Sequence, residues 1–307
     1  MSYPIHIIDR SAETQVEPLG SKPKVWLDSG HTLFKWDVRG TGVDWAEVIA
    51  AQLCQLLGLP HVDYEFAVLA DRGEAIHRGV ICPNIAPGEK ELVLGNQLLL
   101  DVDSAYPSKQ RCKVREHTVD AVCQALTIPR APAPQWAADG PPQVKDALGF
   151  FVGYVMLDAW IANQDRHHEN WGAIRDSAGA DLRLAPTFDH GAGLACILKD
   201  NERHERLTTR DLGYTITAFC ARAKSRFYGS NSERPNLTTL EAYRCFAAKT
   251  PVAATAWIGR LRSVTPDAIW GILDQVPAER MTSLSRDFTC QLLTTNRERI
   301  LEEFPPT

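Results

Sequence analysis

An apolar run from Phe150 to Ile161 leads directly into a polar loop, and this junction constrains the fold more than any other stretch of the chain. Large apolar side chains fill almost every position of the run and no proline interrupts it, so we expect a helix buried on all sides. The pattern ends at Asn163. The polar octet that follows, Asn163 to Asn170, is therefore expected to begin at the edge of the hydrophobic core.

Two short apolar runs follow the octet and predict a β-hairpin. They are Trp171 to Ile174 and Leu182 to Ala185, separated by a turn rich in Asp, Ser and Gly. A hairpin places the residue entering its first strand beside the residue leaving its second. We therefore expect Asn170 and Asp189 to lie side by side, with Asp165 just beyond them.

Three oxygen-bearing side chains in such a cluster indicate phosphoryl transfer. An Asn amide oxygen and an Asp carboxylate suffice to hold Mg²⁺ together with substrate phosphates. A second carboxylate can orient a hydroxyl nucleophile and accept its proton. The spacing from Asp165 to Asn170 is that of a kinase catalytic loop, and Asp189 stands where a kinase has the Asp of Asp-Phe-Gly. In the alternative interpretation, the octet is a solvated loop and Asp189 is a turn residue.

Composition agrees with an enzyme that works in the cytoplasm. The 307 residues are 44% hydrophobic and can bury one large core or two lobes. The net charge of -5 and scattered basic residues do not support nucleic-acid binding. Eight cysteines without a Cys-x-x-Cys pair are typical of reduced thiols, and no apolar run is long enough to span a membrane.

A loop near the N-terminus has the residues of a phosphate-binding segment. It contains Gly20, Ser21, Lys22 and Lys24, just ahead of a predicted hairpin strand. Backbone N–H groups and two lysines can wrap phosphates. The motif is weakly specific, because many such clusters are ordinary surface turns.

Lys35 and Glu47 form a linked prediction. Lys35 lies in an apolar context in the second strand of a hairpin over residues 24–27 and 32–36, and Glu47 lies in a predicted helix over 44–57. A strand lysine followed by a helix glutamate is the order in which a kinase supplies its ATP-binding ion pair. Otherwise Lys35 is an edge-strand lysine facing solvent and Glu47 compensates the helix dipole.

We expect an α+β fold with two lobes. Residues 1–85 would form a small β-rich lobe with one helix, including strands near 62–69 and 75–81, and residues 86–307 a larger, mainly helical lobe. The backbone at Cys82, in the connection between the lobes, would face an adenine ring. A proline-rich stretch over 129–142 is interpreted as an exposed loop of the second lobe.

These motifs together resemble the HipA-like serine/threonine kinases, which include toxin kinases of bacterial toxin-antitoxin systems. The resemblance spans roughly residues 19 to 300 and is most specific at Asn163-x-Asp165-x-His167-x-x-Asn170 and at Pro186-x-x-Asp189. It implies a two-lobed kinase fold. Longer family members carry a further N-terminal subdomain, which we expect to be a separate protein or absent here because the phosphate loop begins by residue 19.

The resemblance also implies roles for individual residues. Asp165 would be the catalytic base, Asn170 and Asp189 would bind Mg²⁺, and His167 would contact the nucleotide. Lys35, with Glu47 beside it, would hold the phosphates of ATP under the loop from Gly20 to Lys24. In the family, serine autophosphorylation in this loop can switch activity off, and Ser21 is the hydroxyl that this loop offers.

The identity of the substrate is open at this point. The toxin relatives imply a protein substrate, such as an aminoacyl-tRNA synthetase or another translation factor, and an antitoxin partner. The motifs at Asp165 and Asp189 also resemble phosphatidylinositol-type kinases, so a lipid or small-molecule kinase is an alternative. Other readings are a kinase-like module that binds ATP without catalysis and a metal-dependent phosphohydrolase with ligands among Asp165, His167, His168, Asp189 and His190.

Overall fold

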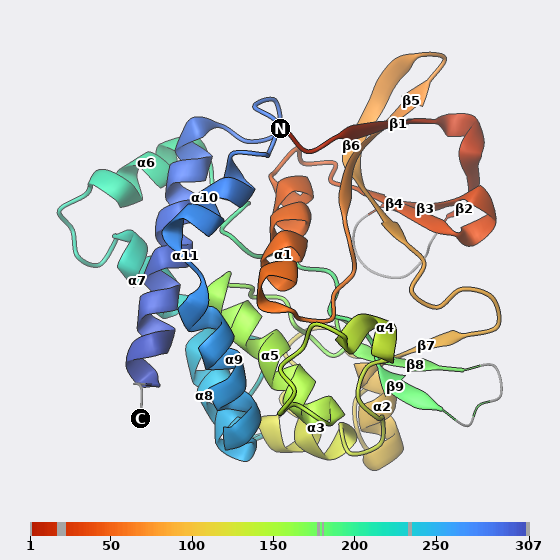
Figure 1. The fold of residues 1–307 in the computed structure, drawn as a ribbon, viewed down its shortest axis with the longest axis vertical. Helices are drawn as coiled ribbons and strands as arrows, with labels where there is room; N and C mark the ends of the chain where they lie inside the picture. The colour runs from red at the N-terminus through yellow and green to blue at the C-terminus, as the bar shows by residue number, and fades with distance from the viewer. Residues whose placement is uncertain (1, 17–22, 177–178, 180, 233–234, 305–307) are drawn as a thin grey trace.

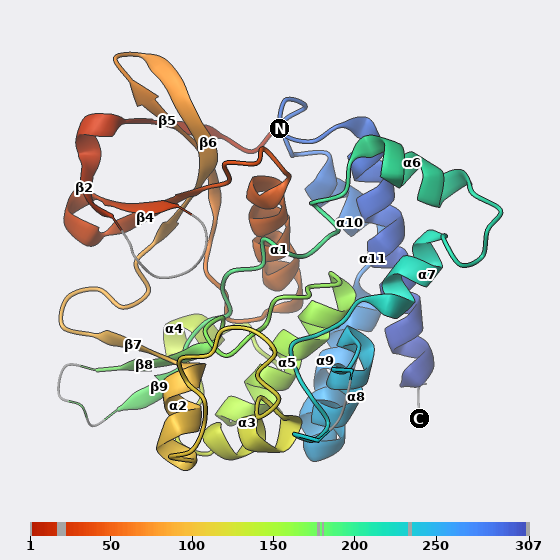
Figure 2. The same ribbon diagram turned by 180° about the vertical axis from the view of Figure 1, so that it is seen from behind.

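The computed structural model describes residues 2–16, 23–176, 179, 181–232 and 235–304. In this structure a curved sheet and one helix, α1 (Val43–Leu57), pack against a larger group of helices (Figures 1 and 2). The α+β architecture is the one that the sequence predicts. Gly20, Ser21 and Lys22 of the expected phosphate loop lie outside the described residues.

Within the described ranges, six strands form one sheet in the order β1-β5-β6-β4-β3-β2. The first strand pairs with β5 in parallel, and the other neighbours are antiparallel. The strand bounds are β1 Ile5–Asp9, β2 Glu13–Val16, β3 Lys24–Leu27, β4 Thr32–Trp36, β5 Glu65–Asp71 and β6 Glu74–Pro83.

Two strands differ from the sequence-based expectation. The first begins at Glu65 rather than at residue 62, because Val62 instead donates its backbone N–H to the Thr187 carbonyl at 3.0 Å. The second, β6, runs on through Pro83. Cys82 therefore pairs with Leu33 in the sheet and is not part of a free connection.

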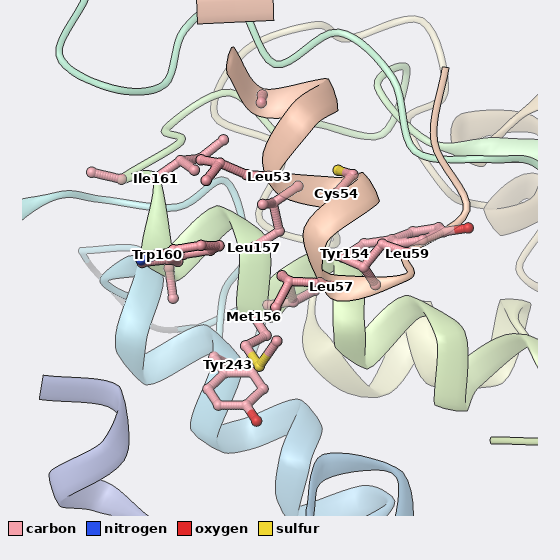
Figure 3. Close-up of a cluster of buried hydrophobic side chains, with 14 of the residues drawn as sticks. Leu53, Cys54, Leu57, Leu59, Tyr154, Met156, Leu157, Trp160, Ile161 and Tyr243 are labelled. Carbon is pink, nitrogen blue, oxygen red and sulfur yellow. The ribbon is translucent and has the colours of Figure 1, made fainter. Parts of the chain in front are cut away.

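Helix α1 ends where its sequence requires a glycine. Gly58 has a φ of +72°, and its N–H closes the last turn of the helix. A Cβ at this position would lie 2.3 Å from the Asp139 carbonyl oxygen, so only glycine fits. The helix lies between the sheet and α5 (Ala147–Trp160). Its side chains Leu53 and Leu57 pack beside Leu157 of α5 (Figure 3).

The predicted hairpin is present as β8 (Gly172–Arg175) and β9 (Leu182–Leu184). A strand that the sequence did not reveal, β7 (Glu91–Leu94), joins it antiparallel to β8. The two chains approach so closely that a Cβ on Gly172 would lie 2.4 Å from the Val93 carbonyl oxygen. This small sheet fixes the start of β8, which follows Asn170, and the end of β9, which precedes Asp189.

The apolar run after residue 147 forms α5, which is buried along nearly its whole length, as predicted. Its C-terminal Trp160 donates its indole N–H to the Leu293 carbonyl of α11 at 3.0 Å. No helix in the described ranges is both long and apolar enough to cross a membrane. The other helices are α2 Gly95–Val102, α3 Val119–Ala125, α4 Pro134–Ala137, α6 Asp200–Thr208, α7 Ile216–Arg222, α8 Thr239–Lys249, α9 Pro251–Ser263, α10 Pro266–Leu273 and α11 Ser283–Glu303.

Candidate active site

The loop that follows α5 is held by a buried ion pair. The guanidinium of Arg166 donates from Nε and Nη2 to both carboxylate oxygens of Asp158, each at 2.8 Å, and from Nη1 to the Asn170 carbonyl at 2.9 Å. Both side chains are almost completely buried. Asn163 also donates its amide N–H to Asp158 at 2.8 Å. Because Asp158 is the last acidic residue of α5, this network fixes the loop to the core helix.

The same loop orients Asn170 and Asp165. Asn170 donates its amide N–H to the Asp165 carbonyl at 2.7 Å. The hydrogen bond uses the amide nitrogen of Asn170 and leaves its amide oxygen out of this contact. The Asp165 carboxylate is 38% exposed and can be reached by a substrate.

Asp189 lies across the lobe junction from the sheet lysine. Its backbone has a φ of +59°, a left-handed conformation that Asp tolerates better than most residues. Lys35 Nζ lies 4.0 Å from the Asp189 carboxylate. Tyr64 connects them, because its hydroxyl accepts hydrogen bonds from Lys35 Nζ at 3.1 Å and from the Asp189 N–H at 3.3 Å.

Glu47 reaches the same turn from helix α1. Its buried carboxylate accepts the N–H of His190, the residue after Asp189, at 2.8 Å. A carboxylate on α1, a lysine on β4 and the turn at Asp189 therefore meet in one place. The sequence predicted that Lys35 and Glu47 lie beside each other, and both reach the turn at Asp189 and His190.

Charges around the site favour a cationic Lys35. Burial alone would lower the pKa of Lys35, but Tyr64, Asp189 and Glu47 outweigh it and raise that pKa well above the usual lysine value. Lys35 lies on β4, which is an interior strand, and its side chain is only 11% exposed. The interpretation of Lys35 as an edge-strand lysine facing solvent is therefore wrong.

The histidines near the loop are neutral. Burial lowers the pKa of His167, although the carboxylates of Asp165, Glu169 and Asp189 oppose this effect. Burial also lowers the pKa of His190 well below the usual value. His167 therefore lies within the electrostatic reach of Asp165 and Asp189 but carries no positive charge at neutral pH.

The remaining predicted residues are placed as follows. Lys24, at the start of β3, pairs in register with Lys35 across the hairpin. Cys82 is buried on β6, and burial raises the pKa of its thiol to about 11. Its role toward an adenine ring, like the roles of Gly20, Ser21 and Lys22, stays a prediction.

Sequence reasoning missed two residues that contact the candidate site. Tyr64 was read as an ordinary strand residue, and only the fold brings it between Lys35 and Asp189. Arg226 pairs with Asp165, with 3.0 Å between its Nη2 and the carboxylate. It lies in the stretch 222–226, which also contains Arg222 and Lys224, but nothing in the sequence links it to Asp165.

The alternative of a histidine-rich metal centre does not fit this geometry. Across the residues that the structure describes, His, Cys, Asp and Glu side chains form no group of three or more that could hold a metal ion. His168 Nδ1 bonds to the Tyr106 hydroxyl at 2.8 Å, and His190 Nε2 bonds to Thr187 at 2.9 Å. The side chains of Asn170 and Asp189 carry oxygen atoms of the kind that Mg²⁺ prefers, and their role as its ligands stays a prediction.

Comparison with solved structures defines the class of fold. No family model and no curated protein matches the chain. The proinflammatory kinase CtkA of Helicobacter pylori has a similar structure, with a TM-score of 0.65 over 96% of both chains at 19% sequence identity. The fold is therefore that of a two-lobed kinase.

A second solved structure adds the family that the motifs resemble. The HipA of Shewanella oneidensis MR-1, solved in a complex of a toxin-antitoxin system with HipB and operator DNA, aligns with a TM-score of 0.55 at 12% identity. The alignment covers 94% of this chain and 66% of that one. The expected resemblance to HipA-like kinases is confirmed at the level of the fold.

Proposed function

We propose that this protein is an ATP- and Mg²⁺-dependent phosphotransferase whose acceptor is a serine or threonine hydroxyl of a protein. One observation supports the proposal: Tyr64 joins Lys35 to the turn at Asp189, and His167, in the loop that carries Asp165 and Asn170, lies within electrostatic reach of Asp189. Neither the loop nor the turn alone is specific, but their combination is the arrangement that phosphoryl transfer needs.

Each residue of the site has a separate role in the proposed reaction. Lys35 holds the phosphates of ATP, and its pairing with Asp189 keeps its charge in place before the nucleotide binds. Asn170 and Asp189 would bind Mg²⁺, which neutralises phosphate charge when bound. Asp165 orients the acceptor hydroxyl and takes its proton. His167, being neutral, can contact the nucleotide without competing with Lys35 for its phosphates.

The substrate class and partners follow from analogy. By analogy with HipA, we include an antitoxin-like protein partner, and a translation factor such as an aminoacyl-tRNA synthetase as the phosphorylated target. Autophosphorylation at Ser21 and a cytoplasmic location belong to the same proposal. These assignments depend on relatives, whereas the assignment of the reaction depends on the geometry of this chain.

The test is an acceptor panel with matched variants. Purified wild-type and Asp165→Asn protein are incubated with labelled ATP and Mg²⁺, together with a serine/threonine peptide library or with phosphatidylinositol vesicles. We expect label in peptides or in the protein itself, lost in Asp165→Asn while ATP binding, measured by calorimetry, remains. Label confined to the lipid would replace the protein acceptor by a lipid. Full activity in Asp165→Asn would overturn the assignment of the base.

A further inference from the structure

The candidate base Asp165 forms an ion pair with a residue from a distant segment of the chain. Arg226 Nη2 donates to Asp165 Oδ1 at 3.0 Å. The side chains are 46% and 38% exposed, so substrates can reach both. Exposed ion pairs contribute little to stability, and this pair lies where the chemistry is proposed to occur. Its presence there calls for a functional explanation.

The backbone around Arg226 is fixed on both sides. Ser225 donates its N–H to the Leu237 carbonyl at 2.8 Å, and Leu237 donates to the Phe227 carbonyl at 3.0 Å. On the other side, the His117 ring bonds to the Arg226 carbonyl at 3.1 Å. The chain bends at Arg226, whose side chain is exposed while its neighbours Ser225 and Phe227 are buried.

A second contact ties the same segment to the catalytic loop. Lys224 donates its backbone N–H to the Gln164 side-chain oxygen at 3.2 Å. Two consecutive loop residues, Gln164 and Asp165, are thus bound by Lys224 and Arg226. The guanidinium is held beside the carboxylate by backbone geometry as well as by charge.

The ion pair of Asp165 and Arg226 has unused hydrogen-bonding atoms for both a hydroxyl and a phosphoryl group. Within the described part of the chain, Oδ1 of the carboxylate accepts the hydrogen bond from Arg226, and Oδ2 accepts none. Of the five N–H donors of a guanidinium, Arg226 uses one on the described residues. A hydroxyl bound at Oδ2 would present its oxygen to the phosphoryl group next to the unused donors of Arg226.

Building on the proposed function, we propose that Arg226 is a catalytic residue that binds the transferring phosphoryl group while it positions Asp165. In the step, the acceptor oxygen forms a bond to the γ-phosphorus of ATP, and the bond from that phosphorus to the bridging oxygen of ADP breaks. The hydroxyl proton passes to Asp165. Arg226 donates hydrogen bonds to the oxygens of the phosphoryl group, whose charge is spread in the transition state.

The test compares Arg226→Ala and Arg226→Lys with a matched control. Arg244→Ala removes a similarly exposed arginine from its pair with Glu303 on another face, at 3.3 Å. The measured quantities are kcat and the KM for ATP when ADP forms from ATP in the presence of Mg²⁺. The phosphoryl group is transferred to the protein itself or to water. We expect kcat to fall about 100-fold in Arg226→Ala with little change in the KM for ATP. Arg226→Lys should fall less, and Arg244→Ala should match wild type.

Added guanidinium ion separates a chemical role from a structural one. At millimolar concentration it should restore part of kcat in Arg226→Ala and leave wild type and Asp165→Asn unchanged. Arg226→Ala with wild-type kcat, or a loss that guanidinium does not restore, would overturn the role of Arg226 while leaving the kinase proposal intact. Wild-type ADP formation no faster than in Asp165→Asn would overturn the proposed function, and this inference with it.

Discussion

Replacement of Arg166 by methionine tests how the loop over residues 163–170 is held. Methionine keeps much of the volume of the arginine stem but removes the charge and all three side-chain hydrogen bonds. Asp158 then stays buried, 3% exposed, without the cation that pairs with it. The carbonyl of Asn170 also loses its 2.9 Å donor, so the loop is released at both ends.

The cost follows from the burial of the pair. Breaking a buried ion pair by removing one partner costs about 3–5 kcal/mol, because an uncompensated charge remains inside the protein. Replacing both partners, in Asp158→Leu with Arg166→Met, should cost clearly less than Arg166→Met alone. The exposed pair of Arg175 and Glu91, at 3.0 Å, provides the comparison: Arg175→Ala should cost about 1 kcal/mol or less.

The assay is urea unfolding followed by circular dichroism, with ATP binding measured on the same samples. Arg166→Met should shift the urea midpoint strongly downward and weaken the binding of ATP with Mg²⁺, because Asn170 is no longer fixed. An unfolding free energy within about 1 kcal/mol of wild type, or a double variant less stable than the single one, would refute the view that this pair holds the loop.

Two further predictions concern residues around the site. Tyr64→Phe removes the hydroxyl that accepts hydrogen bonds from Lys35 and from the Asp189 N–H. The unfolding free energy should therefore fall by about 1–3 kcal/mol, and the KM for ATP should rise. Unchanged values of both quantities would contradict the role of Tyr64 as a bridge between Lys35 and Asp189. Burial lowers the pKa of His117 to about 3, so the unfolded state binds a proton that the native state excludes as the pH falls below 6.5. The unfolding free energy should therefore fall by up to about 1.4 kcal/mol per pH unit between pH 6.5 and 3. In His117→Gln the unfolding free energy should depend less steeply on pH. The same pH dependence in wild type and His117→Gln would refute this role of His117.

Local patterns made the central part of the structure predictable. The uninterrupted apolar run identified α5, and the two short runs after it identified the hairpin of β8 and β9. Asp165 and Asn170 could be placed together from the sequence because one loop fixes their spacing, while their roles stay predictions. The α1 helix was predicted to end at Leu57 because Gly58 follows it, and this end is correct. Its predicted start at residue 44 differs from the observed start at Val43 by one residue.

Contacts between distant segments were not predictable in this way. Tyr64 lies 125 residues from Asp189, and Arg226 lies 61 residues from Asp165. The contact of Tyr64 with Asp189 arises only when the two lobes pack, and that of Arg226 with Asp165 only when distant parts of the larger lobe meet. The strand β7 was missed as well, because it pairs with β8, a strand far from it in the sequence.

The central claim is that Asp165 serves phosphoryl transfer from ATP. The most direct measurement is the intact mass of wild-type and Asp165→Asn protein after incubation with ATP and Mg²⁺, followed by peptide mapping. We expect a mass gain of one phosphate in wild type alone, on Ser21 or a nearby hydroxyl. The same gain in Asp165→Asn, or no gain and no ATP-dependent thermal shift in wild type, would contradict the account.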